Sequence, residues 1–160
     1  MKRWLLVVFA LVTAIANPSS QGKRVIVVNA FTLADGVQLP YDMKQLQAGL
    51  VADLKVQIGK EFEIVAEAPS ASQGMVYTLS GEVTGWRPGN AAKRIIIGMG
   101  SGREASDIHY RVVDGSGQSV VDQTDTIRTN FYSQSAGSVG TLVHPIAQKI
   151  ADRIKDAKLK

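Results

Sequence analysis

The chain has 160 residues, of which 45% are hydrophobic, and a formal net charge of +4 at pH 7. Without Lys2 and Arg3, 16 of its 18 basic residues remain against 14 acidic ones, a balance too mild to indicate nucleic-acid binding. The sequence contains no cysteine, which excludes disulfides, thiolate metal sites, cysteine nucleophiles and a lipid anchor on cysteine.

The N-terminus has the pattern of a signal peptide. Lys2 and Arg3 precede an apolar run over residues 5–16, and Ala14-Ile15-Ala16 is a small-x-small sequence of the kind that signal peptidase cleaves. The run is shorter than the ~20 residues of a membrane-spanning helix, so we favour a cleaved signal over the alternative of a retained N-terminal anchor.

We therefore divide the chain into a signal peptide (1–16), a flexible polar leader (17–24) and a single domain (25–160). The length that follows the signal suits one domain with its own hydrophobic core. We expect this domain to be exported to a bacterial periplasm or cell envelope, with no transmembrane segment after signal removal.

The first half of the domain predicts a strand, a helix and a second strand. Residues 25–31 are apolar and rich in β-branched side chains, which is typical of a strand buried on both faces. From Asp42 to Gly59 the apolar period changes to three and four residues, which predicts an amphipathic helix capped by Asp42. Residues 62–66 predict the next strand. The apolar stripe of the helix comprises Met43, Leu46, Leu50, Leu54 and Ile58.

Alternating patterns follow in the second half. Residues 75–86 and 107–113 alternate apolar with polar side chains, which is typical of antiparallel strands with one solvated face. The sequence Asp114-Gly115-Ser116-Gly117 predicts a tight hairpin turn. The polar residues of 120–129, which follow that turn, indicate an edge strand.

The C-terminal residues predict a second amphipathic helix, with Pro145 in its first turn. Its apolar positions recur every four residues, at Leu142, Ile146, Ile150 and Ile154. Strands flanked by two such helices indicate an α+β fold: a mostly antiparallel sheet packed against two amphipathic helices, in an α/β sandwich.

The stretch RIIIGMGSGRE, from Arg94 to Glu104, places glycines at alternate positions after an apolar run. A phosphate site needs such glycines to lead into a helix N-terminus, and here an alternating strand pattern follows instead. The eight uncharged residues before Arg103 are too few for a spanning helix, although a membrane-inserting hairpin strand needs only ~9 to 11. We favour a buried strand over residues 94–97 whose glycines allow close backbone packing.

No catalytic constellation emerges, so we expect a protein that is not an enzyme and that carries no cofactor or metal. His109 and His144 lie on different predicted elements and lack a carboxylate at a metal-ligand spacing. Asp122 and Asp125 could pair as a hydrolytic site, but a solvated edge strand explains them equally well. Trp86, which precedes a turn, is either an exposed contact residue or a cap on the core.

The segment from Gly81 to Asp122 resembles the bacterial envelope family known as DUF4410, a domain of unknown function. The resemblance rests on the strand Gly81-Glu82-Val83, the turn Pro88-Gly89, Arg94 with the glycine run, and Asp114 with Gly117. Members are small exported proteins, many of them lipidated on a cysteine that this chain lacks. The resemblance implies no catalytic residues.

We therefore expect a non-catalytic envelope domain that acts by binding a protein partner or by assembling with itself. The alternative is a small-molecule or glycan binder that uses Trp86 as a stacking platform. The residues that we assign to interaction or to the family signature are Trp86, Arg87, Arg94, Gly98, Gly100, Gly102 and Arg103.

Overall fold

The computed structural model of the protein describes residues 23–68, 74–89, 103–129 and 139–159. Over these ranges the chain forms one six-stranded sheet and two helices, which confirms the α+β fold. The strands are β1 (Arg24–Val28), β2 (Thr32–Leu33), β3 (Phe62–Val65), β4 (Val76–Arg87), β5 (Ala105–Val113) and β6 (Ser119–Arg128). The helices are α1 (Met43–Ile58) and α3 (Val139–Asp156).

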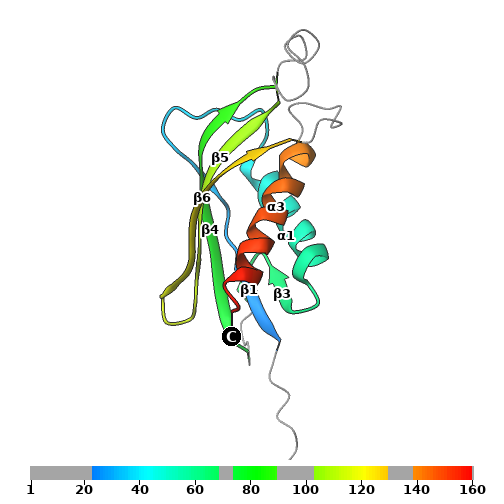
Figure 1. Cartoon of the computed structure of the whole chain (residues 1–160), viewed down its shortest axis with the longest axis vertical. Helices are drawn as coiled ribbons and strands as arrows, with labels where there is room; N and C mark the ends of the chain where they lie inside the picture. The colour runs from blue at the N-terminus through cyan, green and yellow to red at the C-terminus, as the bar shows by residue number, and fades with distance from the viewer. Residues whose placement is uncertain (1–22, 69–73, 90–102, 130–138, 160) are drawn as a thin grey trace, which may run out of the picture.

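The strand order is β3-β1-β4-β5-β6 (Figure 1). β2 pairs with the same edge of β4 as β1 does, but closer to the C-terminal end of β4. The pairs β1–β3, β1–β4 and β2–β4 are parallel. The parallel β1–β3 pair needs a crossover connection, and α1 provides it by carrying the chain back. The pairs β4–β5 and β5–β6 are antiparallel. The sheet is therefore mixed: its two longest ladders are antiparallel, and those of β1 and β2 are parallel.

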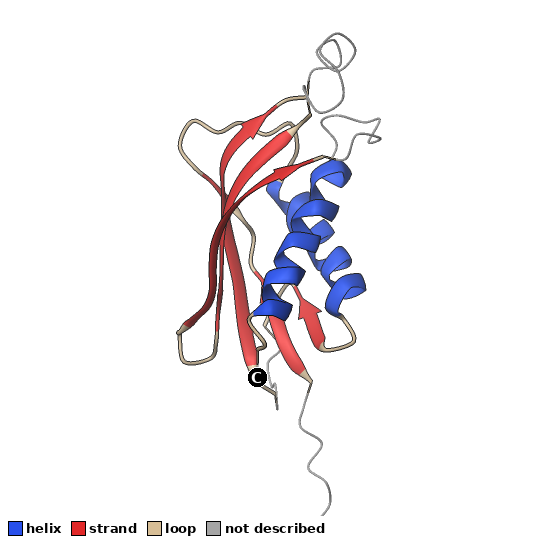
Figure 2. Ribbon diagram, in the orientation of Figure 1, coloured by secondary structure: helices blue, strands red, loops and turns tan. Residues whose placement is uncertain are grey.

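Both helices pack on the same face of the sheet, which we call the inner face; the opposite face is the outer face (Figures 1 and 2). α1 packs on β1 and β3, while α3 packs on α1 and β6. The predicted apolar stripe of α1 faces this core: Leu46, Leu50, Leu54 and Ile58 are all buried. A Cβ on Gly49 would lie 2.9 Å from the methyls of Val143, so the missing side chain lets the two helices approach closely.

Two local sequence signals form as expected. The carboxylate of Asp42 accepts a hydrogen bond from the Lys44 amide at 3.0 Å, which caps α1. In the β5–β6 turn, Oδ1 of Asp114 accepts hydrogen bonds from the amides of Ser116 and Gln118, and Gly117 has a φ of 84° that favours glycine. These contacts fix the start of α1 and the position of the hairpin turn.

β1 occupies the centre of the parallel half and is buried on both faces, as its apolar sequence predicts. Each residue from Val25 to Val28 is at most 6% exposed. Beyond β1 the chain leaves the ladder before β2, and the ring of Phe31 folds onto Gly81 of β4. A Cβ on Gly81 would lie 2.4 Å from that ring, so glycine makes the contact possible.

The structure corrects the expected start of the C-terminal helix. α3 begins at Val139, so Pro145 lies inside the helix rather than in its first turn. The apolar repeat begins only at Leu142, three residues after the helix does, and therefore placed the start too late. Within the described residues, neither helix combines the length and apolarity that crossing a membrane requires.

Candidate functional site

Three of the residues that the sequence singled out meet at one end of the sheet, where β4 ends and β5 begins. Trp86 and Arg87 form the last two residues of β4, and Arg103 lies two residues before β5. We call this the β4–β5 end. The remaining four residues of the predicted set lie outside the described residues, as does the expected strand 94–97. They are Arg94, Gly98, Gly100 and Gly102.

Trp86 is half-buried and packs against the core. Its Nε1 donates a hydrogen bond to Oε1 of Glu104 at 3.0 Å, and Glu104 is only 1% exposed. Burial first, and then the charge of Glu104, raises the pKa of Tyr41 beside this contact. Trp86 is thus engaged internally, which favours the core-cap interpretation over an open stacking platform.

Arg87 and Arg103 differ in their surroundings. The Arg87 guanidinium lies on the exposed outer face and donates hydrogen bonds to both carboxylate oxygens of Asp107, at 2.8 and 3.0 Å. Thr126 of β6 also donates to Asp107, at 2.5 Å. By contrast, Nε of Arg103 is buried and has no hydrogen-bond partner among the residues that the structure describes. Arg87 therefore ties β4 to β5 and, through Asp107, to β6.

A second polar cluster lies further along the outer face. Asp122 of β6 accepts a hydrogen bond from Nη2 of Arg111 at 2.8 Å and lies 2.8 Å from Nε2 of His109. The hydrogen bonds with His109 and then Arg111 hold the pKa of the Asp122 carboxyl below its usual range. The cluster fixes the positions of two basic side chains on β5.

The suggested pairing of Asp122 with Asp125 is wrong. Side chains three residues apart on a strand point to opposite faces. Asp125 accordingly turns to the inner face, where it accepts a hydrogen bond from the Tyr110 hydroxyl at 2.7 Å and one from Arg153 of α3 at 3.4 Å. The two carboxylates therefore belong to separate clusters and do not form a catalytic dyad.

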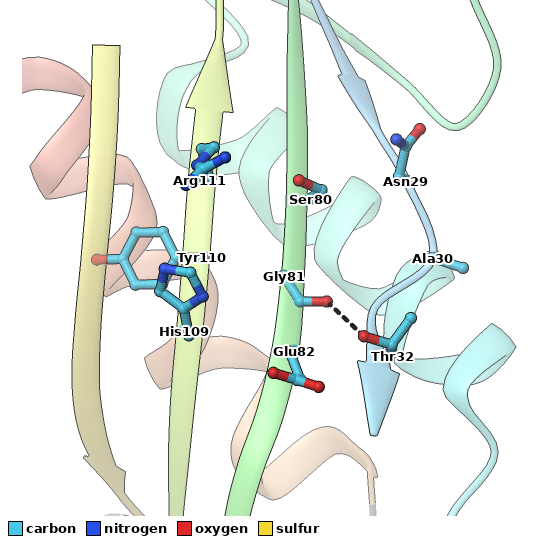
Figure 3. Close-up of a pocket in the computed structure, with 9 residues that line it drawn as sticks. All are labelled: Asn29, Ala30, Thr32, Ser80, Gly81, Glu82, His109, Tyr110 and Arg111. Carbon is cyan, nitrogen blue, oxygen red and sulfur yellow. Dashed lines mark hydrogen bonds between the residues drawn. The ribbon is translucent and has the colours of Figure 1, made fainter. Parts of the chain in front are cut away.

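The outer face is hollowed beside the His109 and Arg111 cluster. A depression of about 400 Å³ lies between β5, β4 and the segment that joins β1 to β2 (Figure 3). Figure 3 shows polar side chains arriving from all three segments, with Asn29 from the joining segment. The full lining is Asn29, Ala30, Thr32, Ser80, Gly81, Glu82, His109, Tyr110 and Arg111.

β6 is confirmed as an edge strand, since it ends the strand order of the described sheet. A groove of about 220 Å³ runs between its second half and α3. The groove is polar, and its lining is Asp125, Thr126, Ile127, Arg128, Pro145, Gln148, Lys149 and Asp152. A backbone edge that borders a groove is the arrangement that accepts an added strand.

Histidine chemistry is limited to pairwise contacts in the part of the chain that the structure describes. Nδ1 of His144 on α3 lies 3.1 Å from a carboxylate oxygen of Asp53 on α1, whereas His109 lies on β5 beside Asp122. Within the described ranges, no three histidine, aspartate or glutamate side chains gather as a metal site would require.

The comparison with protein families decides the family. The model of DUF4410, a domain of unknown function, matches residues 36–132, which is more than half of the chain. The chain belongs to the DUF4410 family. The match includes β4, β5 and β6 and every residue on which the sequence resemblance rests. The comparison with curated proteins finds no relative of this chain.

Solved structures share the fold of this family member. PelC from Paraburkholderia phytofirmans, described as a dodecamer, matches with a TM-score of 0.51 and 20% identity, over 82% of this chain and 88% of PelC. The protein XCC0632 from Xanthomonas campestris matches with a TM-score of 0.54 and 9% identity, over 89% of this chain and 90% of that one. At these identities the likeness concerns the fold alone.

Proposed function

We propose that the protein is a non-catalytic, exported envelope domain that acts by assembling with further copies of itself through the free edge of β6. The observation that carries the proposal is this edge, which is ten residues long, has no second partner strand within the described ranges and is bordered by the polar groove along α3. A long unpaired edge is a ready template for another strand.

The backbone geometry identifies the groups that an added strand would use. The amide of Thr129 donates to the carbonyl of Glu104 at 3.0 Å, so these residues form a hydrogen-bonded pair between β6 and β5. Paired and unpaired positions alternate along an antiparallel ladder. The amides of Thr126 and Thr124 therefore point away from β5, toward the free edge.

The added strand can come from a second copy of the chain, because the sheet has a second free edge among the described residues. β3 ends the described sheet on the opposite side from β6, so each copy offers one free edge on each side. Pairing β6 of one copy with β3 of the next extends the sheet from copy to copy, whereas pairing β6 with β6 gives a two-fold dimer. PelC, which shares the fold, is described as a dodecamer; that assembly supports self-association here only as an analogy.

The test removes one outward amide. Thr124 is exposed, and proline at this position takes away an N–H that the β5 ladder does not use. The mass of the purified chain, measured by size-exclusion chromatography with light scattering, should be a multiple of 17.2 kDa or of the processed chain. Thr124→Pro should reduce it to a single copy, while the matched Thr124→Ala, which keeps the amide, should still assemble.

A second variant guards against misfolding of the proline variant. Gln148→Arg places a longer side chain in the groove from the exposed face of α3 and leaves the β6 backbone unchanged. It should also weaken assembly, with unchanged circular dichroism. A wild-type chain that stays a single copy at high micromolar concentration, or variants that both assemble like wild type, would overturn the proposal.

A further inference from the structure

We propose that the depression on the outer face is a binding site for a small zwitterion, a molecule that carries a carboxylate and an ammonium group a few ångströms apart, as an α-amino acid does. The site is separate from the β6 edge and does not depend on self-assembly. Its basic side is formed by β5 and its acidic side by β4 (Figure 3).

The depression exists because the chain leaves the sheet between β1 and β2. Both strands pair with β4. The amide of Asn29 still donates to the carbonyl of Leu79 at 2.9 Å, but Ala30 and Phe31 lie outside both ladders. Phe31 turns its ring to the inner face against Gly81, whereas Asn29 and Ala30 are exposed at the outer face. Asn29 and Ala30 therefore form one side of the depression, next to the exposed residues of β4 and β5.

The basic side is fixed in place before any ligand arrives. Arg111 donates from Nε and Nη2 to the same oxygen of Asp122, which leaves Nη1 without a partner in the described part of the chain. Ser80 lies directly opposite Arg111 in the β4–β5 ladder and adds a hydroxyl. A held guanidinium with a free N–H and a neighbouring hydroxyl suits a carboxylate.

The acidic side is a carboxylate that the fold leaves unused. Glu82 of β4 lines the depression opposite His109, and no hydrogen bond or ion pair engages its side chain among the described residues. His109 itself lies 2.8 Å from Asp122 through Nε2. Glu82 is thus an available acceptor for an ammonium group.

The spacing of the two sides fits opposite charges on one small molecule. Glu82 and Arg111 are diagonal neighbours, two residues apart along the strand and one strand apart, so their Cα atoms lie roughly 8 Å from each other. Side chains that stand roughly perpendicular to the sheet keep about this separation, and one hydrogen bond of about 3 Å at each end leaves ~2–3 Å for the two charges of the ligand. A lone anion meets repulsion from Glu82 and a lone cation meets repulsion from Arg111, so a zwitterion is preferred.

The test compares three probes of similar size by NMR titration of the purified chain. Alanine carries both charges, propionate only the carboxylate and ethylamine only the ammonium. Alanine should shift the amide signals around the depression and bind about fivefold more tightly than either single-charge probe, the factor that one exposed charge pair supplies.

The decisive variant is Glu82→Gln, which keeps the size of the side chain and removes its charge. It should lower the affinity for alanine about fivefold and raise that for propionate. The matched control Glu63→Gln neutralises an exposed glutamate on β3, outside the depression, and should change neither. Equal binding of alanine and propionate by the wild-type chain, a Glu82→Gln chain that binds alanine unchanged, or no saturable shift would overturn the proposal.

Discussion

Asp107 is the residue on which the outer-face contacts of β4, β5 and β6 converge. Hydrogen bonds from Arg87 and then from Thr126 hold the pKa of the Asp107 carboxyl below its usual range, and they outweigh the opposing effect of burial. Because the pKa is lower in the folded chain, ionised Asp107 stabilises the fold above the unfolded pKa of about 4. That contribution is lost as the pH falls through the folded pKa.

Arg87→Met removes the largest cause of this shift. Between pH 5 and pH 3 the variant should therefore lose about 0.5–1 kcal/mol less of its free energy of unfolding than the wild type, a small value because the Arg87 side chain is 57% exposed. Urea unfolding at the two pH values measures the difference. Lys55→Met, which removes an exposed charge from α1, should leave the wild-type pH dependence unchanged. Identical acid sensitivity of wild type and Arg87→Met would contradict the assignment.

Among the elements, periodicity predicted α1, the antiparallel strands and the edge position of β6, because each pattern reports which face of one element is buried. It could not give the central position of β1, since pairing between distant parallel strands leaves no local mark. The side-chain contacts between β5 and β6 could not be predicted either, because their register is irregular. A register shift between Val112 and Val113 moves the ladder by one residue, so counting from the turn places Val121, and not Asp122, opposite Arg111.

The candidate site was predictable only in part for the same physical reason. Trp86 and Arg87 stand out as a large aromatic and a charge before a turn, and the structure places both at the β4–β5 end. The depression depends instead on Glu82 and Arg111, which are ordinary residues of alternating strands until the ladder makes them neighbours. Only tertiary register creates such a site.

The carboxylate of Asp125 makes polar contacts that connect α3 to the sheet. The side chain of Asp125 on β6 is 14% exposed and accepts a hydrogen bond from Tyr110, while Arg153 and Lys149 of α3 lie 3.4 and 3.9 Å from its Oδ1. Burial, and then the contact with Asp125, raises the pKa of Tyr110. The hydroxyl therefore stays protonated and continues to donate at neutral pH.

A double-mutant cycle tests this connection. Tyr110→Phe and Asp125→Ala should each lower the free energy of unfolding by about 1–2 kcal/mol, because the first removes one donor to the Asp125 carboxylate and the second leaves the Tyr110 hydroxyl without this acceptor. The double variant should be less destabilised than the sum of the two, by at least ~0.5 kcal/mol, as expected for residues in contact. Chemical unfolding followed by circular dichroism gives all four values. Strict additivity would show that the hydrogen bond does not contribute.

For the molecule as a whole, the proposed export makes a prediction about the chain that cells accumulate. When the full sequence is expressed in a bacterium, the protein should be recovered from the periplasm or envelope fraction with Asn17 as its first residue, since the small side chains of Ala14 and Ala16 suit signal peptidase. Intact mass spectrometry identifies the first residue. Ala16→Phe should block the cleavage, and a wild-type chain that keeps residues 1–16 in the cytoplasm would contradict export.

The described ends of the chain lie together. Arg24, at the start of β1, donates a hydrogen bond to the carbonyl of Leu159, just beyond α3, whereas the β4–β5 end is at the opposite end of the sheet (Figure 1). Neighbouring termini make a protein suitable for circular permutation. A short linker from the C-terminus to Lys23 would allow new ends to be opened in the exposed turn at Gly115. Fusion partners attached directly at Lys23 and Leu159 would likewise emerge side by side, at the end of the sheet opposite Trp86.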